Sequence, residues 1–468
     1  MTKALIIGAG VAGKELLGEF RKHKSIKVEV VGFIDDDLVK IGKRVLGVQV
    51  LGQINSLHMA IKKYKVNEIF IAIPSAKGGI IRKIIEKCKD LNISFKVIPR
   101  TLDIIQGKVA ISQIRDVDVS DLIGREMVQM EQNTLINFFK GKKILITGAC
   151  GSIGHEICRQ LALFSPKKLI FYDWWENGMF DLNLEFKSKF TSISTKSIIG
   201  DIKDEVKIDK VFKEEKPDIV FHAAAYKHVP LMEDNPSEAV KNNVFGTMVI
   251  AKIAKKYRSS HFVLISTDKA VNPKSVMGAT KRIAESIVSE SSKNSFTKFI
   301  SVRFGNVLDS FGSVLPLFKK QISEGGPVTV THKDMKRFFM SIPEAVQLIF
   351  QATVFGKGGE IFILDMGEQI RIVDLAKLLI KLSGLVPQKD IKIVYTGLRP
   401  GEKFSEELFT EKENLTKTLN KKIFITENSN LELKDSEGII KTLLQHANHF
   451  NDEMVRKELS KIFTSFKN

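Results

Sequence analysis

Three residues that could exchange protons stand together in this chain: Thr267, Asp268 and Lys269 follow the apolar run at 262–265 after a single serine. Such a run predicts a buried parallel strand, and charged side chains are seldom buried without a partner. In open parallel sheets, ligands bind beyond the carboxyl ends of strands. The alternative is a solvated Asp–Lys pair in a loop, but this position favours acid–base chemistry on a bound molecule.

A glycine-rich turn predicts a site for a second molecule. Gly148, Gly151 and Gly154 follow the apolar run 144–146 and precede a helical segment at 155–161. A strand, a tight turn and a helix N-terminus together present N–H groups and a positive dipole end to a pyrophosphate. Asp173 closes the next strand about twenty residues later, where a carboxylate accepts the hydroxyls of an adenosine ribose. The pattern predicts a dinucleotide site that prefers NAD to NADP; a helix cap without ligand is the alternative.

The elements that must position these residues alternate between strand and helix from residue 142 onwards. Strands are expected at 144–146, 168–173, 197–201, 218–225, 262–269, 299–304 and 361–364. This order predicts an α/β fold with a parallel, Rossmann-like sheet. The residues that follow the strands then converge on one crevice, among them Asp201, placed for an adenine amino group, and the small residues Ala223, Ala224 and Ala225.

A second Rossmann-like unit is expected ahead of the first. Gly8, Gly10 and Gly13 form another strand-to-helix turn, and the strand at 28–33 ends in the acidic turn 35–37. We expect an N-terminal domain at 1–118, a linker at 119–141, and a catalytic domain at 142–468 with a smaller C-terminal substrate-binding part. The first domain has no catalytic cluster, so a ligand and a purely structural or regulatory role both remain open for it. The C-terminal stretch 429–468 is expected to be helical and chemically silent.

Composition limits the class of protein. The 468 residues, 43% of them hydrophobic, suit two or three globular domains. No apolar stretch approaches the ~18–20 residues of a membrane helix, and no secretory signal pattern opens the chain. The three cysteines form no CxxC pair, so neither a metal site nor a disulfide framework is expected. We expect a cytoplasmic protein with no transmembrane segment and at most peripheral membrane contact.

The net charge of +18 has three interpretations. It reflects a solvated, lysine-rich surface, or it attracts an acidic substrate or an anionic membrane face. No basic patch interleaved with aromatic residues and no nucleic-acid motif is present, which argues against nucleic-acid binding.

A helix after the polar cluster extends the catalytic pattern. Met277 and Lys281 lie four residues apart, the spacing of the Tyr-x-x-x-Lys element of short-chain dehydrogenases, which puts both on one helix face. Methionine stands in the tyrosine position and has no ionisable proton. Thr267, Asp268 and Lys269 must therefore supply the proton transfers.

Seven stretches carry a specific resemblance to a known family. They are 147–154, 222–233, 242–247, 266–273, 277–281, 303–307 and 398–403. With them the chain resembles the polysaccharide-biosynthesis, CapD-like nucleotide-sugar 4,6-dehydratases that act on UDP-N-acetylglucosamine, in the extended short-chain dehydrogenase superfamily. The resemblance covers nearly the whole chain, and the first Rossmann unit and Met277 are marks of the family's long form. Because that form usually carries transmembrane helices ahead of the first unit, the chain is similar to a soluble member. Trp174, Trp175, Asp309 and Phe311 depart from the family pattern.

The resemblance implies a lyase that uses NAD without net redox change. A hydride leaves C4 of the sugar, Lys269 removes the C5 proton, and Asp268 protonates the leaving C6 hydroxyl before the hydride returns to C6. Thr267 would hold the C4 oxygen and Lys281 the nicotinamide ribose. The cofactor is expected on Gly148, Gly151, Ser152, Ile153, Gly154, Asp173, Asp201, Ile202, Ala223, Ala224, Ala225 and Lys281. The UDP-sugar is expected on Lys227, His228, Asn306, Ser313, Val314, Arg337, Arg399 and Glu402, and a homo-oligomer is expected.

Two alternatives remain at this point. A nucleotide-sugar epimerase or reductase would share the fold. A tyrosine at position 277 and the absence of an Asp–Lys pair after Thr267 would have favoured that class, and this chain has neither feature. A non-catalytic, dinucleotide-sensing protein would need no charged cluster after the fifth strand.

Overall fold

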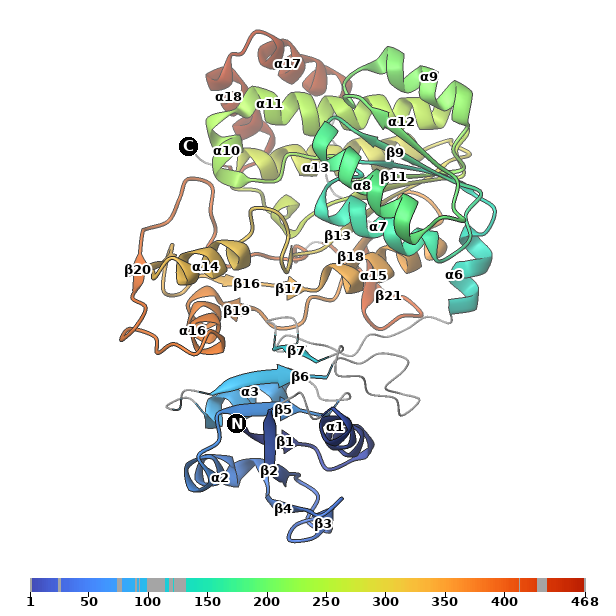
Figure 1. Cartoon of the computed structure of the whole chain (residues 1–468). Helices are drawn as coiled ribbons and strands as arrows, with labels where there is room; N and C mark the ends of the chain where they lie inside the picture. Colours follow the sequence, from blue (N-terminus) through green and yellow to red (C-terminus); the bar gives the residue numbers. More distant parts are fainter. Residues whose placement is uncertain are drawn as a thin grey trace. The chain divides into compact units, whose positions relative to one another are not determined.

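The computed structural model describes residues 2–23, 27–73, 78–88, 91, 93–98, 114–117, 121, 132–411, 413–426 and 436–466. The chain divides into two compact units (Figure 1). The first contains Met1–Glu126, Leu317–Val330 and Val373–Tyr395, and the second contains Met127–Pro316, Thr331–Ile372 and Thr396–Asn468. Most of the expected linker, 119–141, lies outside the described residues, so the proposed domain boundaries stay predictions.

The first unit is built on a sheet of order β3-β4-β2-β1-β5-β6-β7. Its strands are β1 (Thr2–Ile7), β2 (Val28–Ile34), β3 (Arg44–Val45), β4 (Val48–Gly52), β5 (Glu68–Ile71), β6 (Ser94–Val97) and β7 (Arg115–Asp116). The helices α1 (Val11–Lys22), α2 (Leu57–Tyr64) and α3 (Gly78–Lys87) alternate with them. Residues 4–7 of β1 are wholly buried, as expected for a central parallel strand covered on both faces. The unit also includes β15 (Val328–Val330) paired with β20 (Ile393–Tyr395), and most of α16 (Ile372–Leu382).

The second unit is built on a larger sheet of order β10-β9-β8-β11-β12-β13-β18-β22-β21. Its strands are β8 (Lys143–Thr147), β9 (Lys168–Asp173), β10 (Thr195–Ile199), β11 (Ile219–His222), β12 (His261–Ile265), β13 (Lys298–Arg303), β18 (Ile361–Leu364), β21 (Leu415–Lys417) and β22 (Ile423–Thr426). The seven expected strands are present and pair in parallel. The antiparallel edge formed by β22 and β21 was not expected. The strand order reverses between β8 and β11, and ligands of such sheets bind at that reversal.

Helices cover both faces of this sheet (Figure 1). The helices of this unit are α6 (Gln132–Phe139), α7 (Ser152–Ala162), α8 (Glu176–Lys189), α9 (Glu205–Glu215), α10 (Val229–Asp234), α11 (Pro236–Ala239), α12 (Thr247–Lys256), α13 (Val276–Ser292), α15 (Ile342–Phe355), α17 (Ser436–Asn448) and α18 (Asp452–Ile462), and α14 (Val314–Ser323) is divided between the units. The side chains of β8 alternate between two hydrophobic clusters of buried residues. Ile144 and Ile146 pack in one cluster, and Leu145 packs in the other. Across the described ranges, no helix is long and apolar enough to span a bilayer.

Two short ladders bring distant segments toward the end of the sheet. The strand β14 (Asn306–Val307) pairs with β17 (Phe339–Met340), and β16 (Lys336–Arg337) pairs with β19 (Ile370–Arg371). They fix the backbone of Asn306 and Arg337, two of the residues expected to contact substrate.

Candidate active site

The glycine turn has the geometry that its spacing predicts. Gly148 follows β8 with φ +68°, a left-handed conformation that favours glycine. A Cβ on Gly148 would lie 2.6 Å from the backbone nitrogen of Ala224, and one on Gly154 would lie 2.0 Å from the Gly148 carbonyl oxygen. Gly148 therefore lets two strand ends approach, and Gly154 lets α7 pack against the turn.

Asp173 anchors this turn from the end of β9. Its Oδ2 accepts a hydrogen bond from the Cys150 N–H at 2.9 Å, and its Oδ1 accepts one from the Trp175 N–H at 3.1 Å. A carboxylate has about four acceptor positions, so Asp173 can still accept ribose hydroxyls.

A cavity of about 250 Å³ opens between the turn and the neighbouring strand ends. Its lining includes the predicted residues Gly148, Gly151, Asp173, Asp201, Ile202, Ala223, Ala224 and Ala225. Four predicted cofactor residues, Ser152, Ile153, Gly154 and Lys281, are not part of the lining. Sequence reasoning missed Tyr172, Trp174, Trp175, Gly200, Tyr226 and Asn242, which also line it. The tryptophans directly follow Asp173, and Asn242 opens one of the resembling stretches, so both signals were present in the sequence.

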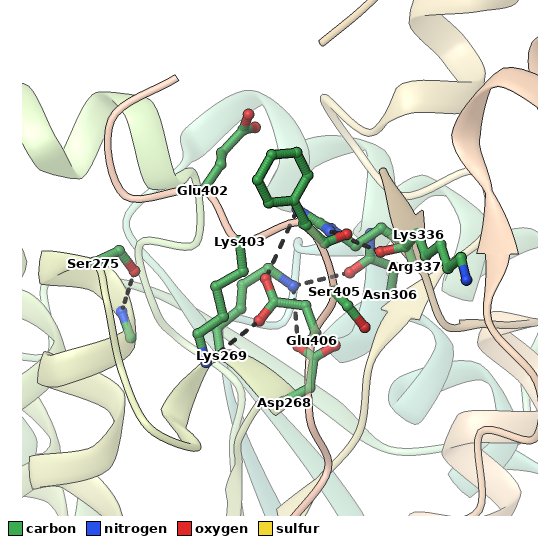
Figure 2. A network of polar contacts seen from close by, with 12 residues as sticks. Asp268, Lys269, Ser275, Asn306, Lys336, Arg337, Glu402, Lys403, Ser405 and Glu406 are labelled. Carbon is green, nitrogen blue, oxygen red and sulfur yellow. Dashed lines mark hydrogen bonds and ion pairs between the residues drawn. The ribbon is translucent and has the colours of Figure 1, made fainter. Parts of the chain in front are cut away.

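The catalytic cluster forms where β12 ends. The strand stops at Ile265, and residues 268–270 form a 3₁₀ turn, so the polar residues leave the strand earlier than expected. Thr267 Oγ1 donates to Asp268 Oδ1 at 2.9 Å, and Lys269 Nζ lies 3.0 Å from the same oxygen. Lys269 Nζ also donates to Asn306 Oδ1 at 2.9 Å (Figure 2). The structure therefore joins the three predicted acid–base residues and one predicted substrate residue into a single hydrogen-bonded group.

Asp268 is the most enclosed member of this group. Its side chain is fully buried, whereas that of Lys269 is 19% exposed. Asp268 Oδ2 makes no hydrogen bond with the described part of the chain. An amine and a carboxyl of this kind can exchange protons with a molecule that reaches them.

The helix α13 presents Met277 and Lys281 below the cluster, and both are buried. Lys281 Nζ donates to the Ile265 carbonyl oxygen at 2.7 Å. Burial lowers the pKa of Lys281 to about 8, against the opposing charge of Glu285. Ser275 caps the helix by accepting from the Gly278 N–H at 3.1 Å.

A carboxylate that sequence reasoning missed, that of Glu406, lies beside the cluster (Figure 2). Glu406 is buried, with Oε1 3.9 Å from Arg337 Nη2 and Oε2 4.0 Å from Lys403 Nζ. Burial raises the pKa of Glu406, as does the charge of Asp268, while Lys269, Arg337 and Lys403 oppose that rise. Burial also lowers the pKa of Lys403. Lys403 ends one of the resembling stretches, but Glu406 lies beyond it and carried no sequence signal.

The predicted substrate residues other than Arg337 fall into two groups. Lys227 and Asn306 lie near the catalytic cluster: partial desolvation and the charge of Lys269 lower the pKa of Lys227, although its side chain keeps contact with solvent. Arg337 instead donates to the carbonyl oxygens of Lys336 and Phe404, at 2.7 and 3.3 Å.

The other group gathers at the turn 398–402. The exposed Arg399 pairs with Glu402 at 2.6 Å. Burial lowers the pKa of His228, helped by the charges of Lys227 and Arg399. A Cβ on Gly312 would lie 2.5 Å from the His228 ring, so the 308–314 loop packs against it. Ser313 Oγ is buried without a hydrogen-bond partner among the described residues, and Val314 begins α14.

A buried ionic network supports the end of β12 from behind. Ser266 Oγ donates to Glu285 Oε1 at 2.6 Å, and Arg303 Nη2 lies 2.8 Å from Glu285 Oε2. Arg303 Nη1 also lies 3.1 Å from Glu413 Oε2. The cationic partners hold the pKa of Glu285 near 2 despite its burial. The network thus ties Ser266, the residue that precedes Thr267, to α13, β13 and Glu413.

Comparison with known proteins agrees with this geometry. Residues 144–428 match the model of a family described as "Polysaccharide biosynthesis protein", and residues 1–99 match a "CoA-binding domain". The chain is 47% identical to a probable polysaccharide biosynthesis protein EpsC of Bacillus subtilis, over 88% of this chain and 69% of that protein. It is 42% identical to a capsular polysaccharide biosynthesis protein CapD of Staphylococcus aureus, over 97% and 76%. It is 36% identical to an inverting UDP-N-acetylglucosamine 4,6-dehydratase of Campylobacter jejuni, over 57% and 77%.

A solved structure shares the same architecture. The crystal structure of Pen from Bacillus thuringiensis superposes with a TM-score of 0.58 at 38% identity, covering 62% of this chain and 91% of that one. The α/β fold with Rossmann-like parallel sheets is thereby confirmed. The chain belongs to the polysaccharide biosynthesis protein family, within the short-chain dehydrogenase superfamily, and has a nucleotide-sugar dehydratase- or epimerase-like function.

Proposed function

We propose that the protein dehydrates a UDP-N-acetylhexosamine, with UDP-N-acetylglucosamine as the first candidate, to a UDP-4-keto-6-deoxy sugar for surface polysaccharide or glycan synthesis. One observation carries the proposal: the hydrogen-bonded group of Thr267, Asp268, Lys269 and Asn306 at the end of β12. Besides the group that handles the proton of the oxidised alcohol, a dehydratase needs a base for the C5 proton and an acid for the leaving C6 hydroxyl. Met277 cannot supply either proton transfer, and this group can.

The residues act on neighbouring sugar atoms. Thr267 holds the C4 oxygen, and the C4 hydroxyl releases one proton to the enzyme when it is oxidised. Lys269, in its neutral form, takes the proton from C5, and Asp268 gives a proton to the C6 hydroxyl, which leaves as water. Lys269 then returns a proton to C5. The proton released at C4 replaces the one that leaves with water, so the enzyme regains its starting state.

The turn after β8 fits NAD. A Cβ on Gly148 would fill the space against Ala224, and the carboxylate of Asp173 keeps acceptor positions free beside the cavity. We propose that Gly148, Gly151, Asp173 and Ala223 to Ala225 hold the cofactor, with Lys281 at the nicotinamide ribose. When bound, NAD accepts a hydride from the sugar and returns it.

Replacing Asp173 with alanine is expected to weaken NAD binding and to relax the preference over NADP. The carboxylate that accepts the ribose hydroxyls and repels a 2′-phosphate would be gone. Titration of the variant with both cofactors checks this. An unchanged preference for NAD would show that Asp173 is not the residue that discriminates against NADP.

The proposal is tested by incubating the protein with UDP-N-acetylglucosamine and following the product and the cofactor absorbance together. We expect a UDP-4-keto-6-deoxy sugar with no net change in cofactor absorbance. Formation of the C4 epimer alone would contradict dehydration.

A further inference from the structure

The N-terminal unit repeats the nucleotide-binding geometry of the catalytic unit. Gly8 has φ +101°, and a Cβ there would lie 2.7 Å from the Ala72 carbonyl oxygen. A Cβ on Gly13 would lie 2.0 Å from the Gly8 carbonyl oxygen, the same distance found between Gly154 and Gly148. Gly8, like Gly148, thus lets two strand ends approach each other, and Gly13, like Gly154, lets the following helix pack against the turn.

The acidic residue after the second strand repeats as well. Asp35 Oδ2 accepts from the Ala9 N–H at 2.8 Å, and Oδ1 accepts from the Asp37 N–H at 2.9 Å. Asp173 makes the matching pair of bonds to its own turn. Lys40 Nζ takes a third position on Asp35, at 3.1 Å from Oδ2, which leaves acceptor capacity for a hydroxyl.

A cavity of about 460 Å³ lies against this turn. Its lining contains the polar or glycine residues Gly8, Gly10, Asp35, Asp36 and Lys40 and the apolar residues Val11, Ile54, Ile73 and Ile80. A glycine turn with both polar and apolar residues around it suits a phosphate and a base joined through a ribose.

We propose that this cavity binds a nucleotide with a free ribose diol and a pyrophosphate, and that it discriminates against coenzyme A, whose ribose carries a 3′-phosphate. Asp35 accepts the diol in the way proposed for Asp173. Two aspartates and one lysine line this end of the cavity, Asp35, Asp36 and Lys40, so their net charge is negative and a phosphate on the ribose meets repulsion. Lys40 does not offset this, because it already pairs with Asp35 and, at 3.4 Å, with Asp37.

The charge of Asp35 supports the same conclusion. Burial alone would raise its pKa, but the N–H groups of Asp37 and Ala9 and the ammonium of Lys40 lower the pKa of Asp35 below its usual value. The carboxylate is therefore ionised at neutral pH. This ligand does not depend on the dehydratase activity. It also differs from coenzyme A, the ligand in the description of the family that matches residues 1–99.

The chain contains its own reporter for separating the two sites. Its two tryptophans, Trp174 and Trp175, both line the cavity of the catalytic unit. A change in tryptophan fluorescence therefore reports binding in that cavity, and calorimetric binding that leaves the fluorescence unchanged and is weakened by Asp35→Asn is assigned to the N-terminal cavity.

The test uses the full chain and two probes that differ only in the ribose phosphate, coenzyme A and dephospho-coenzyme A. Wild-type protein is expected to bind dephospho-coenzyme A at least about tenfold more tightly than coenzyme A at the fluorescence-silent site. Asp35→Asn should weaken dephospho-coenzyme A binding and narrow that ratio to below about threefold, because an amide carries no charge. Asp37→Asn is the matched control: its carboxylate is 46% exposed and does not line the cavity, so the ratio should stay within about twofold of wild type.

Equal or tighter binding of coenzyme A to the wild-type protein would overturn the proposal without any variant. So would the absence of any fluorescence-silent binding of dephospho-coenzyme A, or such binding that Asp35→Asn leaves unchanged.

Discussion

Replacement of Lys269 by alanine is expected to lower the rate of dehydration by a factor on the order of 10²–10⁴ and to stop exchange of the sugar's C5 proton with solvent. Lys269 is the proposed base, and its Nζ is held between Asp268 Oδ1 and Asn306 Oδ1 at 3.0 and 2.9 Å. No neighbouring amine has the same two partners within the described part of the chain, so nothing there replaces it directly. Product formation and the C5 proton signal are measured together by NMR.

Lys274→Ala is the control for this prediction. Lys274 is an exposed lysine in the loop that follows the same strand, so its removal should leave turnover within about twofold of wild type. Substantial C5 exchange by Lys269→Ala would remove Lys269 from the role of base, whatever happens to product formation.

The replacement of Arg303 by methionine is expected to lower the free energy of unfolding by about 3–5 kcal/mol. The Arg303 side chain has no exposed surface and pairs with Glu285 and Glu413, which are also buried. Methionine fills part of the space but leaves two buried carboxylates with less compensation, and that uncompensated charge is the main cost. Denaturant unfolding monitored by circular dichroism measures the change.

The matched control is Arg159→Met, since Arg159 also pairs with a glutamate but lies at the surface. Its Nε is 2.8 Å from Glu185 Oε1, and its side chain is 44% exposed. Surface ion pairs contribute about 0–1 kcal/mol, so this variant should be nearly as stable as the wild type. Similar losses for the two variants would show that burial is not the reason for the effect at Arg303.

The fold was largely predictable because its signals are local. Each parallel strand of the larger sheet contains a short apolar run, and at least one helix separates it from the next strand of that sheet along the chain. The glycine turns mark where strands pass into helices. The edge pair β21 and β22 was missed because its register is set by pairing with β18, a contact far away in the chain. The early end of β12 was also missed, because the 3₁₀ turn that ends it depends on the Thr267 side chain accepting from the Lys269 N–H.

The candidate site was likewise predictable where its residues are close in the sequence, and not where folding brings them together. Thr267, Asp268 and Lys269 are neighbours in the sequence, so their cluster could be predicted, and Asn306 was assigned through the family resemblance. Glu406 could not be predicted, because it lies 137 positions after Lys269 in the sequence and meets the cluster only through folding. The support of Ser266 by Glu285 and Arg303 was equally hidden, since each of these residues alone is typical of a helix or strand surface.

The C-terminal helices also contribute to the support of the candidate site. Arg456 of α18 donates to Glu233 Oε2 at 2.7 Å, and Glu233 Oε1 accepts from the Val276 N–H at 2.8 Å. The last helix therefore supports the start of α13, the helix that carries Met277 and Lys281.

In the proposed reaction, hydride leaves C4 and returns to C6 of the same sugar while Lys269 exchanges the proton at C5. NMR of the product formed from UDP-N-acetylglucosamine in D₂O tests this path. We expect solvent deuterium at C5, because the base exchanges its proton, and none at C6, because that position receives the sugar's own hydride. Deuterium at C6, or a 4-keto-6-deoxy product with no deuterium at C5, would contradict it.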